Sequence, residues 1–197
     1  MSNPGCYPTA CILPFSLLSA ELPEFYPVIA FDAKSGTSGA GGRKEKDGLS
    51  YSQVYENFKA YKIEGHQHQP EIRDYIRLFS PFKEIESRFI PHLLPVYRGL
   101  FATTQIFCTK EPNLANLKEA ARSAEENIFI RYIENPNQVQ LKNVQNTNFL
   151  DFSFHYDKVT KVLTLISAID NLQKGAAGQA IQNMNLMNRY PEEMGLL

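Results

Sequence analysis

Apolar residues recur at helical spacing in four parts of the chain. In one of them Ile72, Ile76 and Phe79 fall on a single face. Pro70 precedes that face at a first-turn position, where a proline is tolerated. Pro14 lies inside another of these segments and is expected to weaken or kink the helix. The predicted helices cover residues 7–20, 70–79 and 113–127, with a last helix that follows residues 170–178 and ends near residue 188.

Shorter apolar segments, rich in β-branched and aromatic residues, predict strands. In one of them Phe152, Phe154 and Tyr156 alternate with polar positions, as in a strand with one buried face. The strands are predicted at residues 26–31, 59–63, 88–94, 100–109, 128–133, 149–156 and 161–169. Helices and strands do not alternate strictly. The pattern therefore predicts an α+β fold with a mixed, mostly antiparallel sheet and helices on one of its faces.

Residues 34–48 interrupt this pattern with the sequence KSGTSGAGGRKEKDG. Five glycines in fifteen residues cannot form a regular element, so we predict a loop with special backbone angles. The part from Ser35 to Gly39 offers hydroxyls and, as a loop, free backbone N–H groups that would suit an anion. The loop has neither the Walker A spacing nor the GxGxxG spacing.

Composition narrows the class of protein. The 197 residues, 43% of them apolar and 21% charged, suit one domain, or one domain with an appendage. A net charge of -1 gives no support for nucleic-acid or anionic-membrane partners. The apolar run from Ala10 to Leu22 is too short for a membrane span and lacks the basic lead of a signal peptide. A cytoplasmic location is therefore the expectation.

The three cysteines do not form a disulfide framework or a metal-ligand pattern. Cys6 follows Pro4 and Gly5 at the mouth of the first predicted helix, where the helix dipole and free N–H groups favour a thiolate. Burial as a plain apolar cysteine is the competing interpretation, and the local sequence leaves both open. Cys11 and Cys108 lie inside a predicted helix and a predicted strand, so we interpret both as structural.

His66 and His68 form a His-x-His pair just before a predicted helix. One of them could serve a thiolate as acid or base. A metal pair is the rival interpretation, but no third ligand has suitable spacing, and ordinary helix capping, in which Glu71 would take part, is another. Arg98 lies at a strand break, where its guanidinium could bind a carboxylate or phosphate in bidentate fashion or simply be solvated. His92 and His155 lie in predicted strands and are interpreted as structural.

Taken together, five segments in this order resemble the N-acetyl-gamma-glutamyl-phosphate reductase family of arginine biosynthesis. They are residues 3–9 (NPGCYPT), 34–41 (KSGTSGAG), 66–72 (HQHQPEI), 95–99 (PVYRG) and 170–180 (DNLQKGAAGQA), the last followed by residues 182–185 (QNMN). The segments cover nearly the whole chain, and their shared order is more specific than any one of them.

The resemblance implies the fold of the C-terminal catalytic domain of glyceraldehyde-3-phosphate dehydrogenase-like enzymes. It also implies an NADPH-dependent oxidoreductase that reduces N-acetyl-gamma-glutamyl phosphate to N-acetylglutamate semialdehyde and phosphate through a thioester on Cys6, with His66 as acid/base. The cofactor would be NADP(H), and no metal is implied. The residues implied to bind substrate are Arg98, Tyr7 and Glu71, and those implied to bind the cofactor are Ser35, Gly36, Ser38, Gly39 and Asn171.

The chain departs from the family pattern in three places. Gly42 intervenes before Arg43 in the glycine-rich loop, and Gln67 replaces an arginine between the two histidines. The sequence also begins at the expected nucleophile, although such enzymes carry an N-terminal dinucleotide-binding domain. We therefore expect a catalytic domain over residues 1–170, and a C-terminal helix within residues 171–197 that packs on the absent domain.

Two alternatives to this function stay open. One is a sister enzyme that reduces another acyl phosphate, of the aspartyl or aminoadipyl type. The other is a non-catalytic fragment that lacks its cofactor domain. The complete protein is expected to be a homo-oligomer that acts on a small molecule, and the chain alone is expected to be inactive.

Overall fold

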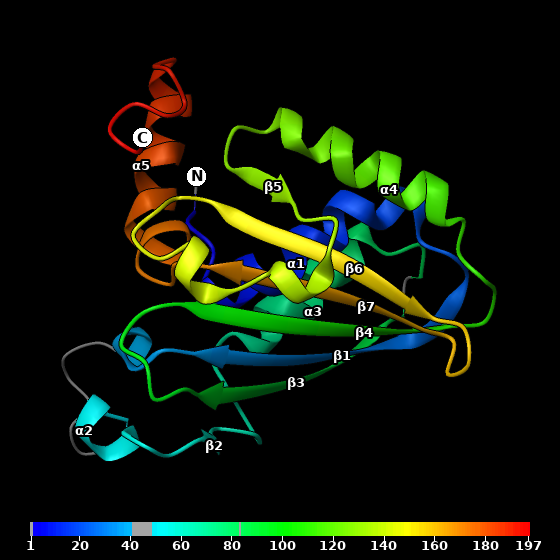
Figure 1. Cartoon of the computed structure of the whole chain (residues 1–197), viewed down its shortest axis with the longest axis horizontal. Helices are drawn as coiled ribbons and strands as arrows, with labels where there is room; N and C mark the ends of the chain where they lie inside the picture. The colour runs from blue at the N-terminus through cyan, green and yellow to red at the C-terminus, as the bar shows by residue number, and fades with distance from the viewer. Residues whose placement is uncertain (1, 41–48, 83) are drawn as a thin grey trace.

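A mixed sheet of seven strands organises the described part of the chain (Figure 1). The computed structural model describes residues 2–40, 49–82 and 84–197. The strand order is β2-β3-β1-β4-β7-β6-β5, with β1–β3 and β5–β6 parallel and the other neighbouring pairs antiparallel. The strands are β1 (Phe25–Ser35), β2 (Lys59–Ala60), β3 (Glu86–Leu93), β4 (Leu100–Cys108), β5 (Ile130–Tyr132), β6 (Leu150–Asp157) and β7 (Val162–Ile169).

β1 runs four residues further than its apolar run predicts, so Lys34 and Ser35 belong to the strand and not to the glycine-rich loop. The reason is that β1 pairs along this stretch with β3 on one side and with β4 on the other. Ala33 and Ser35 face the core, whereas Asp32 and Lys34 face the opposite side of the sheet. The rest of the predicted loop begins with a short 3-10 turn, Thr37–Ala40, and residues 41–48, including Gly42 and Arg43, lie outside the described residues.

Three of the four predicted helices begin and end within a few residues of their predicted bounds, and the last begins as a wider turn at residues 173–177. The α-helices are α1 (Cys6–Leu18), α2 (Tyr51–Val54), α3 (Gln69–Phe79), α4 (Leu114–Ser123) and α5 (Gly178–Asn188). Pro14 lies inside α1 without ending it. The single-turn α2 has no apolar periodicity and was not predicted, although Ser50 and Gln53 form a capping box at its start.

α1 is the central helix of the covered face. It packs against β4 and β7 and contacts α3 and α4, and α3 also contacts β3 (Figure 1). Because neighbours surround it, α1 is apolar almost all round, and Tyr7, Phe15 and Leu18 are buried. The hydroxyl of Ser167 on β7 donates to the carbonyl of Ala10 at 2.7 Å and links the helix to the sheet.

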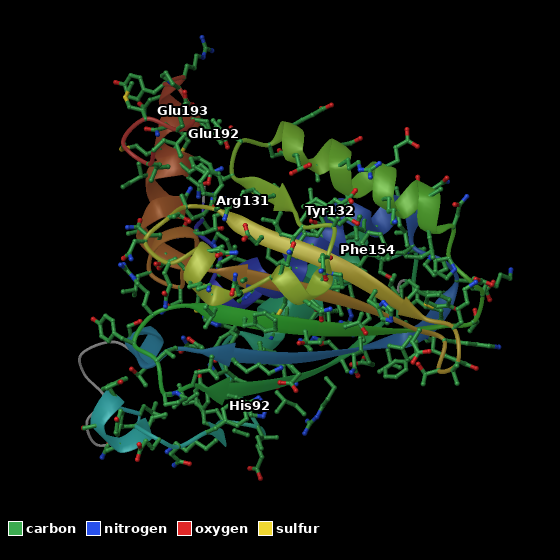
Figure 2. The ribbon with its side chains drawn as sticks, in the orientation of Figure 1. His92, Arg131, Tyr132, Phe154, Glu192 and Glu193 are labelled. Atoms are coloured by element: carbon green, nitrogen blue, oxygen red, sulfur yellow. The ribbon has the colours of Figure 1, made fainter. Side chains whose placement is uncertain are left out.

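The opposite face of the sheet is only partly covered. The connection between β5 and β6 crosses it, and Val139 and Val144 pack there against Ala168. Beyond that connection, His92 of β3 lies 3.0 Å from the carboxylate of Asp32 and stacks on Phe58 (Figure 2). This arrangement confirms the predicted α+β class, with a mostly antiparallel mixed sheet and its main helices on one face.

α5 stands at one end of the sheet, beside the N-terminus (Figure 1). Its outer side and the residues after it expose an unusual number of apolar side chains for a short helix: Ile181, Met184, Leu186, Met187, Tyr190 and Met194. Of the described helices, α5 included, none is long and apolar enough to cross a membrane.

Candidate active site

A small cavity brings the predicted nucleophile and both predicted histidines together. It is bounded by the start of α1, the end of β1 and the segment between β2 and α3. Its volume is about 30 Å³, which is room for roughly two water molecules. The cavity is lined by Cys6, Tyr7, Ser35, Gly36, Gly39, Leu49, Tyr61, Lys62, His66, Gln67, His68 and Leu93.

Cys6 is the first residue of α1, and Gly5 is its N-cap. The backbone N–H of Gly5 donates to Oε1 of Glu71 at 3.1 Å, and its carbonyl accepts from Thr9 at 3.0 Å. A Cβ at residue 5 would lie 2.5 Å from Nε2 of His68, so only glycine fits there. The sequence suggested Glu71 as a cap for its own helix, α3. In the structure its carboxylate instead accepts the N–H of Gly5, the N-cap residue of α1.

Cys6 is half-buried, and the loss of water around its sulfur dominates the protonation of the thiol. It raises the pKa of the thiol from 9.0 to about 11, and the nearby charge of Glu71 adds to the rise. The backbone N–H groups of Tyr7 and of Cys6 itself lower the pKa, but by less than burial raises it. Of the two interpretations that the local sequence leaves open, this pKa favours the protonated thiol, since desolvation outweighs the backbone donors.

His66 is buried and lies in a directed chain of hydrogen bonds. The backbone N–H of His68 donates to Nδ1 of His66 at 3.1 Å, so the neutral ring carries its proton on Nε2. At the far end, Tyr7 donates its hydroxyl to the carbonyl of His92 at 3.2 Å. The hydroxyl of Tyr61 therefore donates to Tyr7, at 3.1 Å, and its oxygen faces Nε2 of His66 at 3.4 Å. This chain fixes both the ring and its tautomer.

His68 has a different environment. Its ring lies against Gly5, and its Nδ1 is buried without a hydrogen-bond partner among the described residues. Burial lowers its pKa, whereas the carboxylate of Glu71 acts in the opposite direction. His68 is therefore a neutral ring near pH 7, packed beside the nucleophile segment.

The turn after β1 uses its backbone donors internally. The N–H groups of Gly36, Thr37 and Ser38 donate to the carbonyls of Gly99, Val96 and Tyr97, and that of Gly39 donates to Gly36. The expectation of free N–H groups is therefore wrong for these residues, because the turn pairs with the segment between β3 and β4. A Cβ on Gly36 would lie 2.7 Å from the carbonyl oxygen of Tyr97, which explains the glycine.

Asn171 and Arg98 hold neighbouring parts of the same end of the sheet. Asn171 accepts from the N–H of Gly99 at 2.7 Å and donates to the hydroxyl of Ser38 at 3.0 Å. Nε of Arg98 lies 3.0 Å from the buried carboxylate of Asp170, and Arg98 also donates to Asn146. Within the described part of the chain, Arg98 is not among the residues that line the Cys6 cavity.

The sequence from Cys6 to Asn171 matches the family model described as semialdehyde dehydrogenase, dimerisation domain (residues 6–171). This match covers most of the chain. The chain belongs to the semialdehyde dehydrogenase dimerisation-domain family. The match begins at the candidate nucleophile and ends at the asparagine that holds Ser38, so the whole candidate site lies within it.

Curated relatives of this family member share one name. A protein of Leptospira interrogans serogroup Icterohaemorrhagiae serovar Lai is 50% identical over 197 residues and is named N-acetyl-gamma-glutamyl-phosphate reductase. A protein of Alkaliphilus metalliredigens with the same name is 44% identical over 202 residues. Both alignments cover the whole of this chain, which spans 58% and 56% of the length of those two relatives.

Solved structures of semialdehyde dehydrogenases share the fold. A probable aspartate-semialdehyde dehydrogenase from Pseudomonas aeruginosa superposes with a TM-score of 0.74 at 16% identity, over 96% of this chain and 62% of that one. The aspartate semialdehyde dehydrogenase of Candida albicans, solved with NADP, gives 0.67 at 13% identity, over 94% and 56%. At these identities the likeness establishes the fold alone.

Sequence reasoning missed two neighbours of the site in this dimerisation-domain fold. Tyr61, whose hydroxyl faces His66, lies in a segment predicted only as a strand. Gly175 packs on Cys6, because a Cβ there would lie 2.7 Å from the Cβ of Cys6. The spacing of five residues between Tyr61 and His66 was a weak local signal for the first. The proximity of Gly175 to Cys6 depends on a contact between distant parts of the chain. The sequence indicated Gly175 only as part of the motif at residues 170–180.

Cys6 is expected to be alkylated before Cys11 and Cys108, but slowly at neutral pH. With a pKa of about 11, only about one Cys6 in a thousand is a thiolate at pH 8. The iodoacetamide rate at Cys6, followed by peptide mass mapping, should therefore rise about tenfold per pH unit up to about pH 11. The same chain unfolded in guanidinium is the control and should reach half of its maximal rate near pH 9. A plateau for folded Cys6 below pH 8 would contradict the burial argument.

Proposed function

We propose that this chain is the catalytic part of an NADPH-dependent acyl-phosphate reductase that converts N-acetyl-gamma-glutamyl phosphate to N-acetylglutamate semialdehyde and phosphate. The observation that carries the proposal is a cysteine at the start of a buried helix that shares one cavity with a histidine of fixed tautomer. The relatives at 40–50% identity support the substrate class. The chain spans little more than half of their length, so the whole enzyme's activity is part of the proposal.

Cys6 is the proposed nucleophile. Its sulfur attacks the acyl carbon, the bond to the phosphate oxygen breaks, and phosphate leaves with the electron pair. The product is a thioester, in which the acyl carbon stays electrophilic and sulfur is a good leaving group for the last step. Because the pKa of Cys6 is about 11 in this chain, the complete site has to supply a positive charge or a base that removes the thiol proton.

His66 is the proposed acid/base. Its Nε2 carries the proton in the neutral ring, as its Nδ1 accepts from the backbone. Nε2 can share this proton with the oxygen of the reacting carbonyl as charge develops there, and take it back when the C–S bond breaks and the aldehyde leaves. Tyr61, and Tyr7 behind it, would hold the ring in place through their hydroxyls.

The described residues lie where the reacting end of NADP(H) would approach Cys6, but they do not fit its phosphates. Ser35, Gly36 and Gly39 line the same cavity as Cys6, which at about 30 Å³ does not enclose a nicotinamide ring, so the ring would meet the nucleophile at the edge of this cavity. The backbone N–H groups of residues 36–39 are already used, and a pyrophosphate needs such donors. When bound, the cofactor supplies the hydride that reduces the thioester carbon. We propose that Ser38 and Asn171 contribute a wall of this site and that a separate domain binds the phosphates.

That separate domain is proposed to pack on α5. Met184 and Met187 on α5 and Met194 after it expose apolar surface on its outer side, while Gln182 and Asn185 face inward. Flexible methionine side chains suit an interface that excludes water. About two fifths of the length of these relatives lies outside the part that this chain matches, which is enough for a dinucleotide-binding domain. This is the role expected of residues 171–197.

The activity is tested with a chimaera that joins this chain to the preceding segment of the Leptospira relative. Oxidation of NADPH with N-acetyl-gamma-glutamyl phosphate is expected, and Cys6→Ala should lower the rate on the order of a thousandfold or more. Cys108→Ala, at a buried cysteine outside the cavity, is the matched control and should keep the rate. Faster turnover of aspartyl or aminoadipyl phosphate would reassign the substrate. A folded chimaera without turnover of any acyl phosphate would favour a non-catalytic domain.

The same assay distinguishes the roles of His66 and His68. In the chimaera, His66→Asn is expected to lower turnover about 100- to 10,000-fold through loss of the acid/base. His68→Asn is expected mainly to lower stability, by about 1 kcal/mol, because its ring packs on Gly5. Turnover and melting temperature are measured for both variants. If His68→Asn abolishes turnover while His66→Asn leaves it near the wild-type rate, the assignment is wrong.

We also propose that the chain self-associates through the uncovered face of the sheet. An apolar groove lies there, lined mainly by Phe58, Leu94, Phe101, Val139 and Leu141. A groove of this kind on a sheet suits a second sheet packed face to face. The description of the family as a dimerisation domain supports self-association.

This association predicts that Phe101→Asp shifts the chain from dimer to monomer in analytical ultracentrifugation, because the carboxylate would be desolvated in the interface. Leu78→Asp, at an exposed position on α3 on the other face of the sheet, is the control and should leave the dimer intact. A wild-type chain that is monomeric at high micromolar concentration would contradict the proposed interface.

A further inference from the structure

The chain between β7 and α5 forms a π-helical turn, residues Gln173–Ala177. The N–H of Gly175 donates to the carbonyl of Asp170, and that of Ala177 donates to Leu172, both at 2.9 Å and both across five residues. Such wide turns are rare, and they occur frequently at functional sites because they displace one residue out of helical register. The residues that this turn places next to the candidate site are therefore of functional interest.

The π-turn contacts the segment that carries the nucleophile. Gly175 packs so closely on Cys6 that a Cβ would lie 2.7 Å from the Cβ and 3.3 Å from the Cα of Cys6. The side-chain amide of Asn3 donates to the carbonyl of Ala176 at 3.0 Å. The backbone of the turn thus forms one wall behind Cys6, and a shift of the turn would change the burial of the thiol.

Lys174, inside this turn, is almost completely buried, with 3% of its surface exposed. Its ammonium donates to Oε1 of Gln182 on α5 at 2.7 Å and lies 5.5 Å from the ring centre of Phe129. Gln182 also accepts from the side chain of Asn148 and donates to Glu192, which lies beside α5 in Figure 2. Lysine is rarely buried this deeply unless its charge is paired or hydrogen-bonded.

Burial lowers the pKa of Lys174 to about 8, and the charge of Glu192 works in the opposite direction. The group is therefore still mostly charged near pH 7, and the cost of its desolvation is offset by the acceptor on Gln182 and by the ring of Phe129. Among the described residues that line the Cys6 cavity, Lys174 does not appear, so it does not act on substrate directly.

We propose that Lys174 is a positioning residue for Cys6: its side-chain amine, which can donate in its charged and in its neutral form, ties the π-turn to α5 through Gln182 and so keeps Gly175 packed against the nucleophile. This inference rests on the proposed role of Cys6. The chain of contacts runs from Glu192 and Gln182 through Lys174 to Gly175 and ends at the sulfur-bearing residue. Removal of this N–H donor loosens the turn, lets water reach the thiol, and returns the pKa of Cys6 toward its ordinary value.

The test compares the pH dependence of Cys6 alkylation in the 197-residue chain and in its Lys174→Met variant. Methionine keeps the apolar stem and removes the donor. The midpoint of the iodoacetamide profile at Cys6 is expected to fall from about 11 by about one pH unit or more, and the rate at pH 8 to rise about tenfold. Lys174→Arg, which keeps a charged donor, should stay closer to wild type than Lys174→Met. Lys158→Met, at an exposed ion pair with Glu111, is the matched control and should leave the profile unchanged.

A lower melting temperature with an unchanged midpoint would show that Lys174 only stabilises the fold, and would overturn the inference. If Lys174→Met does not fold, Gln182→Met, which keeps the lysine but removes its acceptor, is measured instead, with the same shift expected. A different result would show that the proposed role of Cys6 as nucleophile is wrong. In that case Cys6 of the unmodified chain would not be labelled ahead of Cys11 and Cys108, whatever the variants do.

Discussion

The start of α1 is held from two sides, and this constraint fixes most of the candidate site. On one side the carboxylate of Glu71 accepts the N–H of Gly5, and on the other Gly175 packs on Cys6. Both contacts need a residue without a side chain, because a Cβ at either glycine would collide with a neighbour. The helix itself packs against the sheet, α3 and α4, and these neighbours restrict its movement. The sulfur is therefore placed by close packing.

The same packing that places Cys6 also determines its chemistry. The mouth of a helix supplies N–H groups that stabilise a thiolate, and these donors are present in the structure. Burial by the π-turn and by the histidine segment removes water from the thiol, and that effect is the larger of the two. Cys6 is half-buried, so its thiol is disfavoured as a thiolate and reacts slowly with oxidants and alkylating agents near neutral pH.

The local pattern of apolar and polar residues predicts the elements that have strong periodicity. It does not predict the contacts between parts of the chain that are distant in sequence. The amphipathic α3 was predicted correctly because its apolar residues recur every three or four positions. The end of β1 was missed, since glycines follow it at once, although pairing on both sides keeps Lys34 and Ser35 in the strand. The motifs identified Cys6 and His66 as candidate site residues, and both line the same cavity in the structure. The acceptor for Gly5, the hydroxyl beside His66 and the lysine of the π-turn depend on tertiary contacts that no local spacing encodes.

The two sides of α5 make different contacts. Together they connect the proposed docking surface with the turn behind Cys6. The inner side carries Gln182, which accepts from Lys174, and the outer side carries the exposed methionines. A protein surface that packs on the outer side would restrict the same rigid helix that anchors the turn behind Cys6. Docking and protonation of the thiol would then be thermodynamically coupled, and by reciprocity any modification of the thiol would alter the affinity of docking. On the proposed assembly, the helix would link docking of the second domain to the reactivity of Cys6.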